Sequence, residues 1–130
     1  MKKILLIGII LMLVGCDLST CVDYTIKNAI NTDIEIKSYD NTLNEIRTIN
    51  IAALKNYSEL SICEMGLNSI TYAPYDSIQI LLNGVVRKTY YPDDDGKSIY
   101  KIKDPESWHI IKNEKKHKKY EFIITNEDLD

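Results

Sequence analysis

The chain has 130 residues, of which 27% are charged and 45% are hydrophobic, and its formal net charge is −3. This length suits one domain with its own core. The mildly acidic balance differs from that of a general nucleic-acid binder, so we expect no nucleic-acid partner.

The first fifteen residues differ in composition from the rest of the chain. Lys2 and Lys3 precede an apolar run that extends from Ile4 to Val14. A basic start followed by a short apolar run is typical of a secretory leader. A membrane-spanning helix needs about 20 apolar residues, and this run ends well before that length. We therefore expect residues 1–15 to be a cleaved signal peptide.

The leader ends in a box of four residues, Leu13-Val14-Gly15-Cys16. In this box the chain resembles the bacterial lipoproteins. The resemblance implies that the Cys16 thiol receives a diacylglyceryl group, that the leader is cut before Cys16, and that the new amine is also acylated, for example by palmitate. Two or three fatty chains would hold the protein stably on a membrane, because each buried methylene contributes about 0.8 kcal/mol. The alternative is an ordinary leader with an incidental cysteine.

Two cysteines remain once Cys16 is assigned to the lipid, and they are Cys21 and Cys63. Oxidation is permitted outside the cytoplasm, and a bridge closing a loop of about 40 residues would contribute a few kcal/mol. Spacing alone does not show whether the two sulfurs meet, so a disulfide and two free thiols both stay open. We expect residues 16–21 to be a lipidated tether and residues 22–130 to form a single β domain.

Short alternating segments predict strands along most of this domain. Residues 22–27 and 34–37 alternate apolar and polar side chains, with the period of two that marks a half-buried strand. Residues 46–51 and 57–63 predict two further strands. The clearest hairpin is residues 76–91, because Asn83-Gly84 at its centre tolerates the positive φ angles of a type I′ turn.

The last third of the chain is more ambiguous. Residues 99–103 predict another short strand, and Asp104-Pro105 could cap a short helix. We favour instead a closing hairpin in which Trp108 and Ile110 alternate with polar neighbours, a lysine-rich loop follows, and a second strand returns. That strand has three apolar side chains on one face, Tyr120, Phe122 and Ile124. Seven or eight strands predict an all-β fold, an antiparallel β-sandwich of Ig-like or barrel-like form.

The region after the leader is similar to small uncharacterised lipoproteins of the Bacteroidetes. The similarity lies in residues 24–28 with 34–39, in the strand from Asp76 with its Asn-Gly turn, and in residues 120–128. It implies a cell-envelope location and brings no activity with it. We expect the lipid to lie in the outer membrane, with the domain facing the periplasm or the outside.

No motif of catalytic or metal chemistry stands out. His109 and His117 lack the spacing of a metal site, and no nucleophile-elbow or phosphate-loop pattern occurs. The three consecutive aspartates of residues 93–96 are unlike the alternating ligands of a calcium loop and favour a solvated turn. We expect no catalytic residues, no metal, no cofactor and no enzymatic activity.

A basic cluster follows the predicted strand at Trp108, and its lysines are Lys112, Lys115, Lys116, Lys118 and Lys119. Such a cluster could contact anionic lipid head groups or acidic polysaccharide. The alternative, which we favour from sequence alone, is a solvated hairpin loop whose charge discourages pairing at the sheet edge.

Two classes of function are consistent with this sequence. The first is a non-enzymatic, membrane-anchored binding module for an envelope protein or glycan. The second is an inhibitor or immunity-type lipoprotein that protects the envelope from a hostile enzyme.

Overall fold

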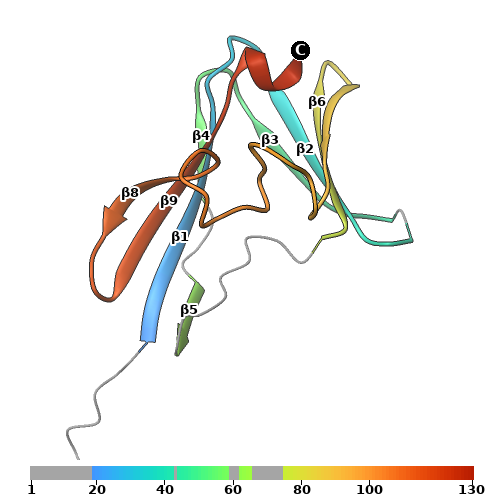
Figure 1. Ribbon diagram of the computed structural model, residues 1–130. Coiled ribbons are helices and arrows are strands. Elements are labelled where there is room, and N and C mark those ends of the chain that lie inside the picture. The colour runs from blue at the N-terminus through green and yellow to red at the C-terminus, as the bar shows by residue number, and fades with distance from the viewer. Residues whose placement is uncertain (1–18, 43, 59–61, 66–74) are drawn as a thin grey trace, which may run out of the picture.

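The structure is a computed structural model and describes residues 19–42, 44–58, 62–65 and 75–130 (Figure 1). Within these residues it contains nine strands and one short 3-10 helix, so the predicted all-β class is confirmed. In chain order the elements are β1 (Ser19–Asn28), β2 (Ile34–Tyr39), β3 (Glu45–Ile51), β4 (Asn56–Ser58), β5 (Ile62–Met65), β6 (Ser77–Leu82), β7 (Val85–Tyr90), β8 (His109–Asn113), β9 (His117–Ile124) and η1 (Asn126–Leu129).

The strands form two sheets, which appear in Figure 1 as two layers. The first, called here the β1 sheet, has the order β4-β1-β9-β8, and β5 pairs with β1 beside β4. The second, the β2 sheet, has the order β3-β2-β6-β7. All pairs are antiparallel except β1 with β9, which run parallel from Cys21 opposite His117 to Asn28 opposite Ile124. The predicted β-sandwich is confirmed, with this one parallel pair added.

The core lies between the two sheets. Many of the side chains that form it are those that the alternating sequence pattern predicted to be apolar and buried. Strand β1 buries Val22, Tyr24 and Ile26, and its intervening residues mostly face away. The other strands contribute Ile34, Ile36, Ile49, Ile51, Ile78, Ile80, Phe122 and Ile124. Burial of this apolar surface is the main stabilising contribution to the fold.

The central hairpin has the predicted turn. Strands β6 and β7 are joined by Asn83 at φ 50° and Gly84 at φ 77°. Positive φ at both positions twists the turn to match the right-handed twist of the flanking strands. A local pattern of two residues thus determined this connection.

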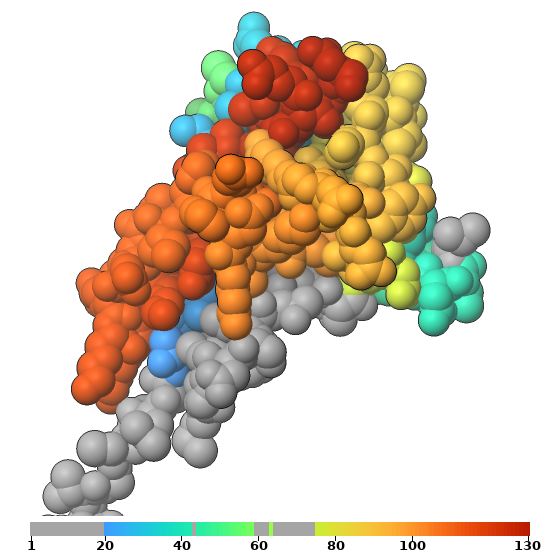
Figure 2. Space-filling view, in the orientation of Figure 1, coloured from blue at the N-terminus to red at the C-terminus, as the bar shows by residue number. Residues whose placement is uncertain are grey.

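Residues 99–103 are not a strand, and that prediction is wrong. They form successive turns, closed by hydrogen bonds from Lys101 N to Ser98 O and from Asp104 N to Lys101 O. Ile99 and Ile102 are both buried. A spacing of three places both side chains inward from consecutive turns, whereas a strand would have pointed them to opposite faces. In Figure 2 the orange segment from residue 91 onward crosses the front of the molecule between the sheets.

Two strand boundaries also differ from expectation. The single strand predicted for residues 57–63 appears as β4 and β5, and residues 59–61 between them lie outside the described residues. Both pieces pair with β1, β4 with residues 25–27 and β5 with residues 19–22. Strand β1 begins at Ser19, so residues 19–21, assigned above to the tether, belong to the sheet. Pairing with β5 extends the strand toward the N-terminus.

Candidate functional site

A depression of about 440 Å³ opens where β8 leaves the turns that precede it. Trp108 lines it from directly before β8, His109 and Ile110 line it from the start of β8, and Tyr120 lines it from the neighbouring strand β9. The turns contribute Ile102, Lys103 and Pro105. The wall is mostly apolar, with two basic side chains at Lys103 and His109, which is the character of a small recognition site.

A tight turn at Asp104 positions this lining. Trp108 N donates to Asp104 O at 2.9 Å, and the Ser107 hydroxyl donates to Asp104 Oδ2 at 2.7 Å. The Ser107 hydroxyl, and after it the backbone N–H of Glu106, hold the pKa of the Asp104 carboxyl below its usual value. The turn places the Trp108 side chain in the core. There its ring centroid lies 5.3 Å from that of Phe122, and its Nε1 donates a hydrogen bond to Ile99 O.

Strand β8 forms an edge of the β1 sheet, and among the described strands it pairs only with β9. Its pairing shifts between Ile110 and Lys112, so that Ile111 is the extra residue of a bulge. Consecutive isoleucines are therefore both exposed, Ile110 by 54% and Ile111 by 49%. The strand predicted to include Trp108 and Ile110 begins one residue later, at His109, and of these two side chains only Trp108 is buried.

The basic cluster spans the turn of the closing hairpin and the adjoining ends of β8 and β9. Glu114 N donates to His117 O, and the two lysines between them, Lys115 and Lys116, are exposed at the tip. Lys112 lies 3.5 Å from Glu114, and both residues belong to the same hairpin. The remaining lysines, Lys118 and Lys119, are half-buried on β9.

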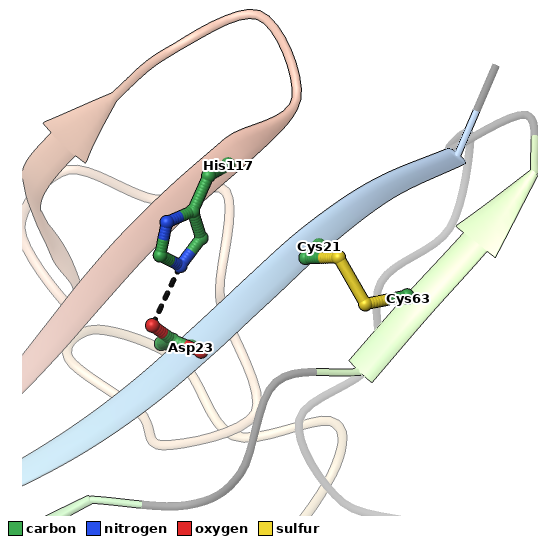
Figure 3. The surroundings of a disulfide bond; sticks show 4 residues. All are labelled: Cys21, Asp23, Cys63 and His117. Atoms are coloured by element: carbon green, nitrogen blue, oxygen red, sulfur yellow. Dashed lines mark hydrogen bonds and ion pairs between the residues drawn. A yellow bond between two sulfur atoms is a disulfide. The ribbon is translucent and has the colours of Figure 1, made fainter. Parts of the chain in front are cut away.

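The same end of the β1 sheet is cross-linked. Cys21 on β1 and Cys63 on β5 lie opposite one another in the register and form a disulfide with their Cα atoms 4.0 Å apart (Figure 3). Two residues further along β1, Asp23 Oδ2 lies 2.6 Å from His117 Nε2 on β9 (Figure 3). Strand β1 is thus joined to β5 by a covalent bond and to the start of β9 by a side-chain contact.

The other candidate residues lie apart from these features. Cys16 lies outside the described residues. In the 93–96 turn, Asp94 accepts a hydrogen bond from Tyr91 N, while Asp93 and Asp95 are exposed. The described part of the chain holds no group of three or more side chains able to bind a metal ion. None of its helices is long and apolar enough to cross a membrane.

No sequence pattern predicted the depression itself. Ile102 and Pro105 come from turns, Ile110 from an edge strand and Tyr120 from its neighbour. No local pattern marks residues that meet only through pairing of β8 with β9. One signal was present in the Ile110-Ile111 pair, since two adjacent apolar residues in an alternating strand indicate a bulge or an exposed edge.

Comparison with known proteins adds no relative, because no family model, curated protein or solved structure matches this chain.

Proposed function

We propose that this chain is a lipid-anchored protein of the cell envelope whose β domain is a non-enzymatic binding module. The leader and its terminal box support the anchor, and Cys16 is the residue that would carry the lipid. Strand β1 starts three residues after Cys16, so the folded domain would sit close to the membrane surface.

The observation that carries the binding role is the exposed apolar edge of β8 beside the depression. An edge strand presents unpaired backbone N–H and C=O groups, which can hydrogen-bond an extended peptide from a partner. Ile110 and Ile111 offer apolar contacts along that edge, and the depression provides room for one larger side chain. We therefore favour an envelope protein as the partner over a glycan.

Mass spectrometry of the protein purified from its native membrane tests the anchor. We expect a chain that begins at Cys16 and carries a diacylglyceryl group with further acylation. A Cys16→Ala variant should keep its leader and lose the lipid mass. An intact Met1 or an unmodified Cys16 thiol in the native protein would refute this part of the proposal.

Site-directed photo-cross-linking tests the binding role. A cross-linking residue at position 111 on β8 should capture one defined envelope protein, and Ile110→Asp should reduce the yield about tenfold or more, because a charge at that edge must be desolvated. The matched control is position 86 on β7, where Val86 is 45% exposed. Equal products at both positions, or polysaccharide alone at position 111, would refute strand pairing. A captured enzyme would indicate an inhibitor, and a structural protein would indicate a binding module.

A further inference from the structure

The parallel pairing of β1 with β9 places the lysine-rich turn at the end of the domain where β1 begins. Cys21 N donates to Lys116 O at 2.8 Å, and Cys21 lies opposite His117 in the ladder. The tip of the hairpin is therefore level with the first residues of β1. In Figure 1 the β8–β9 turn and the start of β1 lie at the same lower end of the molecule.

Chain length limits how far this turn can lie from the proposed anchor. An extended chain spans at most about 3.6 Å per residue, so the five residues from Cys16 to Cys21 cover no more than about 18 Å. Lysine side chains add further reach toward the surface. The ceiling of about 18 Å is a little over two Debye lengths, the Debye length being about 8 Å at physiological ionic strength, and any less extended chain brings the turn closer to the head groups.

The charge of this turn suits a negatively charged surface. Residues 112–119 contain five lysines and one acidic residue, Glu114, on a chain whose overall charge is −3. Glu114 lies near Lys112, and His117 contacts Asp23. Among the ion pairs of the described residues, none involves Lys115 or Lys116. The two exposed lysines at the tip are therefore available to an external anion.

Two acidic side chains are exposed at the opposite end of the domain. Strand β9 runs for eight residues away from the turn, a rise of about 26 Å at 3.3 Å per residue. Beyond it lies η1, where Glu127 is exposed, followed by exposed Asp130. A domain with lysines near its anchor and exposed carboxylates at its far end would be oriented by an anionic membrane.

We propose that the β8–β9 turn is a second membrane contact, in which Lys115 and Lys116 bind anionic phospholipid head groups of the leaflet that holds the Cys16 lipid. Lys112, Lys118 and Lys119 add to the local positive potential. The contact orients the strands of the β1 sheet roughly perpendicular to the membrane and directs η1 away from it. This inference rests on the proposed lipid anchor and adds to it the orientation of the domain.

Paramagnetic broadening of amide NMR signals tests the contact. The lipidated protein is placed in nanodiscs of phosphatidylcholine alone or mixed with phosphatidylglycerol, each carrying a lipid with a spin label in its head group. We expect signals of residues 114–117 to broaden strongly in the anionic discs and to recover in the neutral discs or at high salt. Signals of η1 should stay sharp in both.

The variant K115E/K116E should abolish this broadening. Each lysine near an anionic surface contributes about fivefold, so removing two shifts the contact equilibrium by about 25-fold or more. The variant K55E/K88E makes the same charge change at two exposed sites, one directly before β4 and one near the middle of β7. Its signals should broaden as those of the unmodified chain do. Equal broadening in neutral and anionic discs, or no effect of K115E/K116E, would overturn the proposal.

Mass spectrometry of the same preparation distinguishes failure of the membrane contact from failure of the lipid anchor. Lipid on Cys16 without charge-dependent broadening refutes the membrane contact and leaves the anchor in place. An unmodified Cys16 refutes the anchor, and the protein added to the same discs still reports whether Lys115 and Lys116 reach the head groups.

Discussion

At the residue scale, the turns before β8 are held by a short chain of side-chain hydrogen bonds. Ser107 Oγ accepts from Ser98 N at 2.9 Å and donates to Asp104 Oδ2 at 2.7 Å. Both serines are fully buried. Because this segment has no ladder partner, its buried backbone groups need such side chains, and Ser107 satisfies one of them.

The variant Ser107→Ala should destabilise the protein by about 1–3 kcal/mol, because it leaves the Ser98 N–H buried without an acceptor. Urea unfolding measures this loss. The exposed neighbour provides the control, since Glu106→Ala keeps the backbone N–H and should change stability by less than about 0.5 kcal/mol. A loss for Glu106→Ala as large as for Ser107→Ala would contradict the assignment.

The same variant changes the titration of Asp104. Its folded pKa lies below the ordinary value of 3.8, mainly because the Ser107 hydroxyl stabilises the carboxylate. Its contribution to stability is therefore present above the ordinary pKa and is lost as the pH falls through the folded pKa. In Ser107→Ala the pKa of Asp104 should rise toward 3.8, as measured by an NMR titration of the carboxyl carbon. An unchanged pKa would show that the backbone N–H of Glu106 is the main cause.

At the element scale, the β6–β7 hairpin depends on backbone conformation more than on packing at its turn. Gly84 has φ 77°, and a Cβ built there would meet nothing within 4 Å. Space is therefore available for a side chain, and the remaining cost of a substitution is that of the left-handed conformation.

Replacing Gly84 with alanine should lower the free energy of unfolding by about 1–2 kcal/mol, because L-residues with a Cβ are strained at positive φ. Gly84→Asn should recover a substantial part of this loss, since asparagine tolerates the left-handed region. Urea unfolding of both variants provides the comparison. If asparagine costs as much as alanine, the strain explanation fails.

At the scale of the whole molecule, the long-range links gather on β1. This strand pairs with β9 along its length and with β4 and β5 on its other edge. The Cys21–Cys63 bridge joins residues 42 apart in sequence. It links β5 covalently to the N-terminal end of β1. The bridge therefore stabilises the end of the sheet that lies next to the proposed anchor.

Removing the bridge with Cys21→Ser and Cys63→Ser together should destabilise the domain by about 3–4 kcal/mol, the loop-closure entropy expected for a loop of this length. Thermal unfolding with and without reductant checks this value. Reductant should lower the stability of the unmodified chain and leave the double variant unchanged. Equal stability of the oxidised chain and the double variant would mean that the bridge does not constrain the unfolded chain.

Local sequence patterns were enough to predict most strands. The period of two in residues 22–27 and 34–37 predicted which side chains of β1 and β2 enter the core, and Asn83-Gly84 predicted the hairpin turn. The lysine-rich turn of the closing hairpin was also predicted. These features depend on neighbours along the chain, so the residues themselves carry the information.

The sequence by itself thus determined the all-β class, the faces of the main strands and the β6–β7 hairpin, and it favoured the closing hairpin over a short helix. Only the tertiary structure decided that β1 runs parallel to β9, that residues 99–103 form buried turns, and that Ile110 is exposed beside Tyr120. The physical reason is that periodicity records which face of a strand is apolar. The partner of that strand is selected by the packing of residues far apart in the chain, and this packing also brings the lysine-rich turn level with the start of β1.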